Sequence, residues 1–241
     1  MAMQVGLEGL IESAERCLAN GSYGQALTIY NSIIAAVKVN PFLFKRRGLI
    51  HRMLGNMDQA IADFTQAIQL NPGDSASYWE RGACHSQKLS LANGVTPIDR
   101  QEILANVIKD YRASVVRDPT SAEAWLAIVE THLLMRNWDD AISDYGACQP
   151  YIKTDALKLV RAWLGCLALA FSGDAIEVED QSPLSDSGIR LRSTDWCISE
   201  IDGLLRDLAI EKTYDDVLRA AQEIHQRFLD HFDEPPIGLR N

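Results

Sequence analysis

Small and apolar residues recur three or four positions apart in residues 55–72, GNMDQAIADFTQAIQLNP. That spacing places them on one face of a helix, because an α-helix completes a turn every 3.6 residues. Turn-forming residues lie at both ends of the stretch, Gly55-Asn56 at the start and Asn71-Pro72 at the close. The pattern predicts one short amphipathic helix between two turns.

The same pattern returns along the chain. Ala60 is followed four residues later by the aromatic Phe64, and a shift of 34 residues towards the N-terminus reaches Ala26 and Tyr30. The segment DDAISDY at 139–145 repeats the alanine and the aromatic with the same spacing. A fixed period of this length is the signature of a repeat architecture.

The period and its residues resemble the tetratricopeptide repeat family. The matching features around Ala60 are the small Gly48 twelve residues before it, Phe64 four residues after it and Pro72 at the end of the repeat. The resemblance implies an all-α fold, a right-handed superhelical α-solenoid of antiparallel helix pairs with C-terminal capping helices. One repeat cannot bury its apolar face alone, so neighbouring repeats stack.

The pattern divides the chain into successive segments. We expect repeats at 7–40, 41–74, 75–121 and 122–152, an additional helix at 153–172, an exposed acidic loop at 173–194, a degenerate capping helix pair at 195–232 and a disordered tail at 233–241. The third repeat has about 13 extra residues between its helices. Thr96-Pro97 followed by Asp99 is a helix start, so we expect the first helix to end near Leu91 and the second to begin near Pro97.

Ion pairs inside the repeats are predicted from two positions. Arg47 and Arg81 lie at position 7 of their repeats, and Asp63 and Asp110 lie at position 23. The favoured interpretation is a structural Arg–Asp pair that fixes register, and the alternative is an exposed arginine that binds a ligand. Histidines recur at position 11, but equivalent side chains of stacked repeats point the same way, so we expect packing and no metal site.

The concave face is the expected binding surface, and the resemblance assigns it to the first helix of each repeat. The residues that it places there, as candidates for binding a partner, are Phe42, Lys45, Arg46, Leu49, Arg52, Trp79, Leu126 and Leu133. The basic and aromatic members favour a peptide in which an acid lies beside an apolar anchor. The alternative is a solvated face without a specific ligand. Leu126 and Leu133 form a separate apolar patch, which either the chain's own C-terminal helices or a partner would cover.

The family's chaperone-binding members hold a peptide's terminal carboxylate with lysine and asparagine at fixed positions. Here Lys45 is followed by Leu49, Glu80, Glu123 and Ala127 at the corresponding positions. This clamp is therefore missing, and a chaperone tail is not the expected ligand.

Charge and motifs narrow the function classes. The net charge is −10, with +1 in residues 1–120 and −11 in residues 121–241, which argues against nucleic-acid binding. The sequence has no catalytic or nucleotide-binding motif, no signal peptide and no apolar run that could span a membrane. Five scattered cysteines are typical of reduced thiols in a cytoplasmic protein. We expect a non-catalytic scaffold that binds a protein or peptide and has no cofactor or metal. The alternative is a homo-oligomer formed through the C-terminal apolar face or through oppositely charged ends.

Overall fold

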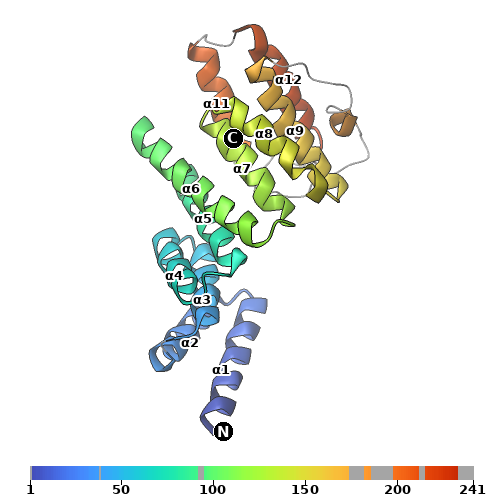
Figure 1. The fold of residues 1–241 in the computed structure, drawn as a ribbon. Helices are drawn as coiled ribbons and strands as arrows, with labels where there is room; N and C mark the ends of the chain where they lie inside the picture. Colours follow the sequence, from blue (N-terminus) through green and yellow to red (C-terminus); the bar gives the residue numbers. More distant parts are fainter. Residues whose placement is uncertain are drawn as a thin grey trace. The chain divides into compact units, whose positions relative to one another are not determined.

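The protein is described by a computed structural model that covers residues 2–37, 39–91, 95–173, 182–185, 198–211 and 215–232. All regular secondary structure in these ranges is helical (Figure 1). The chain forms two compact units, unit 1 at Met1–Asn93 and unit 2 at Gly94–Asn241. The fold is an all-α solenoid, as the sequence predicts.

Unit 1 contains five helices in its described residues, each packed on the next. They are α1 (Ala2–Ala19), α2 (Tyr23–Ala36), α3 (Pro41–Met53), α4 (Met57–Leu70) and α5 (Ser75–Leu91). Pro41 occupies the first turn of α3, where its missing N–H costs nothing, and Asn40 Oδ1 accepts a hydrogen bond from the Phe42 N–H at 3.0 Å. The local sequence thus fixes where α3 begins.

Close packing between α3 and α4 depends on a glycine. A Cβ placed on Gly48 would lie 3.0 Å from the Phe64 ring, and both residues are buried. These are the small and aromatic positions of the repeat pattern. The pattern therefore reflects the need for a small residue opposite the aromatic ring, so that the two helices can pack closely. The turn between the two helices uses Gly55 at φ 78°, and the corresponding residue of the predicted fourth repeat is Arg136 at φ 61°.

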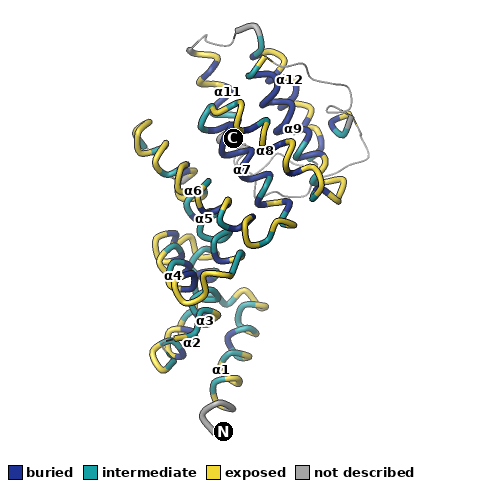
Figure 2. The backbone as a smooth tube through the Cα atoms, viewed as in Figure 1, coloured by how far each residue is buried: buried dark blue, intermediate teal, exposed yellow. Residues whose placement is uncertain are grey.

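Unit 2 holds the remaining helices. They are α6 (Pro97–Arg117), α7 (Ala122–Leu134), α8 (Trp138–Cys148), the short 3₁₀ helix η1 (Gln149–Tyr151), α9 (Asp155–Ser172), the short 3₁₀ helix η2 (Ser182–Ser185), α11 (Ile198–Glu211) and α12 (Asp215–Leu229). Helices α6 to α9 pack in succession, α12 packs on α9, and α11 packs on α7 and α12. Figure 2 shows α7 and α9 as largely buried elements.

The helix ends around the extra residues of the third repeat agree with the sequence. Helix α5 ends at Leu91 and α6 begins at Pro97, where Thr96 Oγ1 accepts a hydrogen bond from the Asp99 N–H at 3.1 Å. The boundary between the two units falls between these helices, inside the predicted repeat. Residues 92–94, between the two helices, lie outside the described residues.

One segment differs from the sequence prediction. We expected residues 173–194 to form an exposed loop, but four of them, Ser182–Ser185, form a 3₁₀ helix in contact with α9 and α12. Leu184 is buried, and its carbonyl oxygen lies 3.3 Å from His231 Nε2. Apolar contact to two helices outweighs the polar composition of the surrounding sequence. The rest of that loop and the tail at 233–241 lie outside the described residues.

Candidate functional site

The predicted concave face of unit 1 is formed by α1, α3 and α5, the first helices of the three predicted repeats. Phe42 and Met53 of α3 are its exposed apolar residues, with 43% and 59% of their surface accessible. Lys45, Arg46, Leu49, Arg52 and Trp79, the other predicted binding residues of this unit, are half-buried. The structure therefore brings the six candidates of unit 1 onto two neighbouring helices.

Every cation among these candidates is already in an ion pair. Lys45 Nζ lies 3.0 Å from Asp74 Oδ2, and Arg52 Nε lies 3.1 Å from Glu80 Oε2. The Arg46 guanidinium donates to both carboxylate oxygens of Glu15, with 2.7 Å between Nε and Oε1. The Arg46 pair joins α3 to α1, the Arg52 pair joins α3 to α5, and Lys45 binds the residue just before α5. The pairs therefore hold the helices of this face together and neutralise its positive charge.

A buried tyrosine adds to the Arg46 pair. The Tyr30 hydroxyl of α2 donates a hydrogen bond to Glu15, and burial raises the pKa of Tyr30 to about 12. The carboxylate of Glu15 therefore has a guanidinium and a phenol as partners and is held firmly in place. Sequence reasoning missed the pairing of Glu15 with Arg46 and of Glu80 with Arg52. Opposite charges 31 and 28 residues apart, close to one repeat length, were the available signal.

The predicted apolar patch of unit 2 is inaccessible to a partner. Leu126 and Leu133 have no accessible surface, and Leu134 is also buried. Helices α6, α8, α9 and α11 of the same unit pack around α7, which carries all three leucines. Leu126 and Leu133 are therefore core residues, and their assignment as partner-binding residues is wrong. The chain's own C-terminal helices α9 and α11 pack on α7, so they and not a partner help to cover these leucines.

The Arg–Asp pair of the second repeat is bidentate. Arg47 Nε and Nη2 donate to Asp63 Oδ2 and Oδ1 at 2.8 and 2.6 Å, and Arg47 Nη1 donates to Asn31 of the preceding repeat at 2.9 Å. Arg81 makes the corresponding contact to Thr65 at 3.1 Å. Its predicted partner Asp110 belongs to the other unit, so that pairing stays a prediction.

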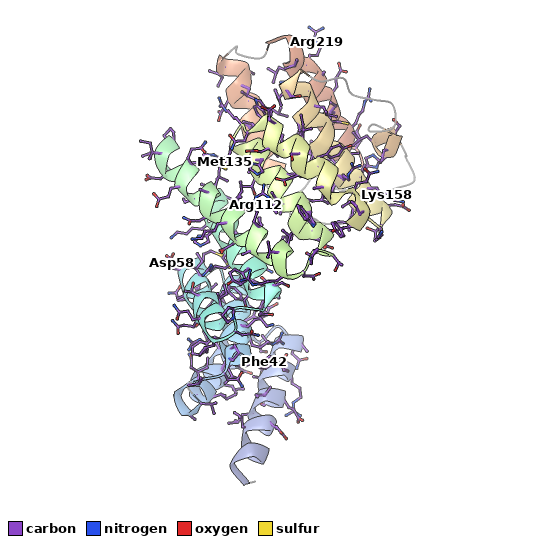
Figure 3. All side chains as sticks on the ribbon, in the orientation of Figure 1. Phe42, Asp58, Arg112, Met135, Lys158 and Arg219 are labelled. Carbon is purple, nitrogen blue, oxygen red and sulfur yellow. The ribbon has the colours of Figure 1, made fainter. Side chains whose placement is uncertain are left out.

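In the fourth repeat, the arginine that pairs with the position-23 aspartate comes from a different position of the chain. Position 7 is occupied there by Ile128, and the guanidinium comes from Arg112 of α6 (labelled in Figure 3). Arg112 Nη2 donates to Asp144 Oδ2 at 2.9 Å. Sequence reasoning missed this residue because it lies one repeat earlier, at the position equivalent to Thr65.

The recurring histidines face these carboxylates. His51 Nε2 lies 4.0 Å from Asp63 Oδ2, and His132 Nε2 lies 3.3 Å from Asp144 Oδ2. Burial lowers the pKa of His51, while Asp63 acts in the opposite direction. Within the described residues no group of side chains could hold a metal ion, and the two histidines act as neighbours of a structural ion pair.

A tetratricopeptide repeat model matches residues 41–74, the second predicted repeat. Residues 41–74 are thus a tetratricopeptide repeat. The matched segment holds α3, α4 and the Gly48–Phe64 contact, and solved repeat proteins share the fold over most of the chain. One is a tetratricopeptide repeat protein from Parabacteroides merdae ATCC 43184, 14% identical with a TM-score of 0.60, covering 93% of this chain and 77% of that one. Another is YrrB, 12% identical with a TM-score of 0.57, covering 73% and 81%.

A curated relative matches about half of this chain. The serine/threonine-protein phosphatase T of Aspergillus oryzae (strain ATCC 42149 / RIB 40) is 24% identical over 132 residues, which are 53% of this chain and 25% of that protein. The chain thus matches a quarter of that relative's length. None of the described helices is long and apolar enough to cross a membrane.

Proposed function

We propose that the protein is a non-catalytic interaction module that binds a peptide or helix of a partner protein on the face formed by α1, α3 and α5. The observation that carries this proposal is a difference between the two units. Unit 1 leaves Phe42 and Met53 of α3 exposed and Trp79 of α5 half-buried, whereas α7, the first helix of the predicted fourth repeat, is covered by its neighbours in unit 2. Large exposed apolar residues are typical anchors for a partner.

The known use of this fold supports the same proposal. The structure of YrrB is described as that of a repeat protein with an unusual peptide-binding site, and repeat arrays present extended surfaces suited to peptides and helices. Catalysis has no support from the described site, which consists of ion pairs and apolar side chains. Nucleic acid is not the proposed partner, because the cations of this face are already paired with acids.

Binding can be tested with peptides selected against the full chain from a random display library. Phe42→Ala combined with Met53→Ala should weaken the selected peptides at least about ten-fold, because two apolar anchors are lost. Ile98→Ala combined with Val116→Ala is a matched control, since these α6 residues are also highly exposed. Equal loss in both double variants, or loss in neither, would refute the assignment of the binding face.

The alternative function is self-assembly. One of its two predicted routes, through the C-terminal apolar face, depends on Leu126, Leu133 and Leu134, which are buried inside unit 2. The route through oppositely charged ends is left.

A further inference from the structure

The ion pairs of unit 1 indicate which charge a ligand of the α1–α3–α5 face should carry. Lys45, Arg46 and Arg52 are the cations of the α1–α3–α5 face, and each is bound to an acid of a neighbouring segment. An acidic ligand would have to displace Asp74, Glu15 or Glu80 before reaching a cation. The displaced carboxylate would then lie unpaired beside the ligand's own negative charge, which is unfavourable.

Two acids on the same face have no such partner. Glu8 and Glu12 of α1 are exposed, and the described residues place no cation in an ion pair with either one. They lie seven and three residues before Glu15, so all three fall on one side of the helix. Two like charges four residues apart are mildly unfavourable in a helix. Both also lie beyond the first turn of α1, where the helix dipole would favour an acid.

Exposed apolar surface lies on the neighbouring helix. The Arg46–Glu15 pair joins α3 to α1, and both helices pack against α2. If α2 is antiparallel to both, as the repeat pattern predicts, α1 and α3 run in the same direction. Phe42 lies four residues before Arg46 and Glu12 lies three residues before Glu15. Both are therefore about one turn from the same ion pair.

We propose that this face binds a peptide in which a lysine or arginine lies close to a bulky apolar residue. The cation would pair with Glu8 and Glu12, and the apolar residue would pack on Phe42. Arginine suits the two carboxylates because its planar guanidinium can bind more than one of them. The inference rests on the proposed function and adds the charge of the partner, which is opposite to the acidic peptide that the sequence favours.

Three synthetic peptides test the charge. They share a helical ten-residue frame with phenylalanine four residues from a variable position, which is arginine, glutamate or glutamine. Fluorescence anisotropy with the full chain at low ionic strength should show the arginine peptide binding about ten-fold or more tightly than the glutamate peptide. Glu8→Gln with Glu12→Gln should remove most of that preference, whereas Phe42→Ala should weaken all three peptides.

A charge-matched control separates a local effect from a general one. Glu102→Gln with Glu123→Gln removes two exposed acids of α6 and α7 and should leave the arginine preference unchanged. Equal loss in this control would overturn the proposal, because the protein's overall negative charge would then account for the binding. Binding that depends on Phe42 but favours glutamate, or ignores charge, would overturn the charge assignment and keep the proposed function. Absence of any Phe42-dependent binding would overturn both.

Discussion

The ion pair between Arg47 and Asp63 illustrates how one residue position stabilises a repeat. Asp63 has 6% of its side chain accessible and receives two hydrogen bonds from the guanidinium. Replacing it by asparagine removes the charge and leaves a largely buried arginine without its counter-ion. We therefore expect Asp63→Asn to lower the free energy of unfolding by about 3 kcal/mol, measured by denaturant unfolding.

The same helix offers a control for this substitution. Asp58 pairs with Lys88 at 2.6 Å, but its side chain is 74% accessible. Exposed pairs contribute little, so Asp58→Asn should cost less than about 1 kcal/mol. Comparable losses for the two variants would mean that burial does not set the strength of these pairs.

A buried histidine should make stability depend on pH. Trp163 Nε1 donates a hydrogen bond to His225 Nδ1 at 3.2 Å, and burial lowers the pKa of His225, while Asp202 acts in the opposite direction. The folded state therefore favours neutral His225, and below the unfolded pKa of about 6.5 the unfolded chain binds the extra proton. Stability is unaffected by this group at high pH and falls as the pH drops below that value, down to the folded pKa.

The variant His225→Asn tests this dependence. Asparagine keeps an oxygen near the position of Nδ1 to accept from Trp163, but it does not titrate. Between pH 7 and about 5 the wild type should lose stability more steeply than the variant, by up to about 1.4 kcal/mol per pH unit. His51 still titrates in both proteins, so a residual slope is expected in the variant. Parallel unfolding profiles for the two proteins would contradict this role of His225.

At the scale of helices, replacing either of two glycines of unit 2 by alanine should change stability in opposite directions. A Cβ on Gly165 of α9 would overlap the Tyr145 ring of α8, whereas a Cβ on Gly146 would meet nothing within 4 Å. Gly165→Ala should therefore destabilise the protein by about 1–3 kcal/mol through overpacking. Gly146→Ala should stabilise it by about 0.5–1 kcal/mol, because alanine is the better helix former. Thermal unfolding of both variants decides whether close approach or helix propensity dominates.

The elements were more predictable from the sequence than the site. Local signals such as Asn40-Pro41 and Thr96-Pro97 fix helix starts, since capping depends on adjacent residues. The Gly48–Phe64 contact lies within one repeat and was visible in its pattern. The pairing of Arg46 with Glu15 and the burial of Leu126 depend on neighbouring repeats and on α11, so the pattern of one repeat does not contain them.

The whole molecule carries its charge unevenly. Unit 1 has eight basic and seven acidic side chains, whereas unit 2 has fifteen and twenty-six. The two units therefore differ far more in the size of their net charge than in its sign, with +1 for unit 1 and −11 for unit 2. Unit 1 also has most of its cations in internal ion pairs. Two copies would bring together two strongly negative units with little positive surface to compensate.

We therefore expect the protein to be monomeric, with a mass of 26.8 kDa by light scattering that does not depend on concentration. Salt distinguishes the two ways in which this expectation could fail. Association at low salt that is lost at physiological salt would identify charge-steered contact between unlike ends, because screening acts over about 8 Å at that ionic strength. Association that strengthens with salt would instead identify an apolar contact. If Phe42→Ala abolished such an apolar contact, a second copy of the chain would occupy the face proposed here for a basic peptide.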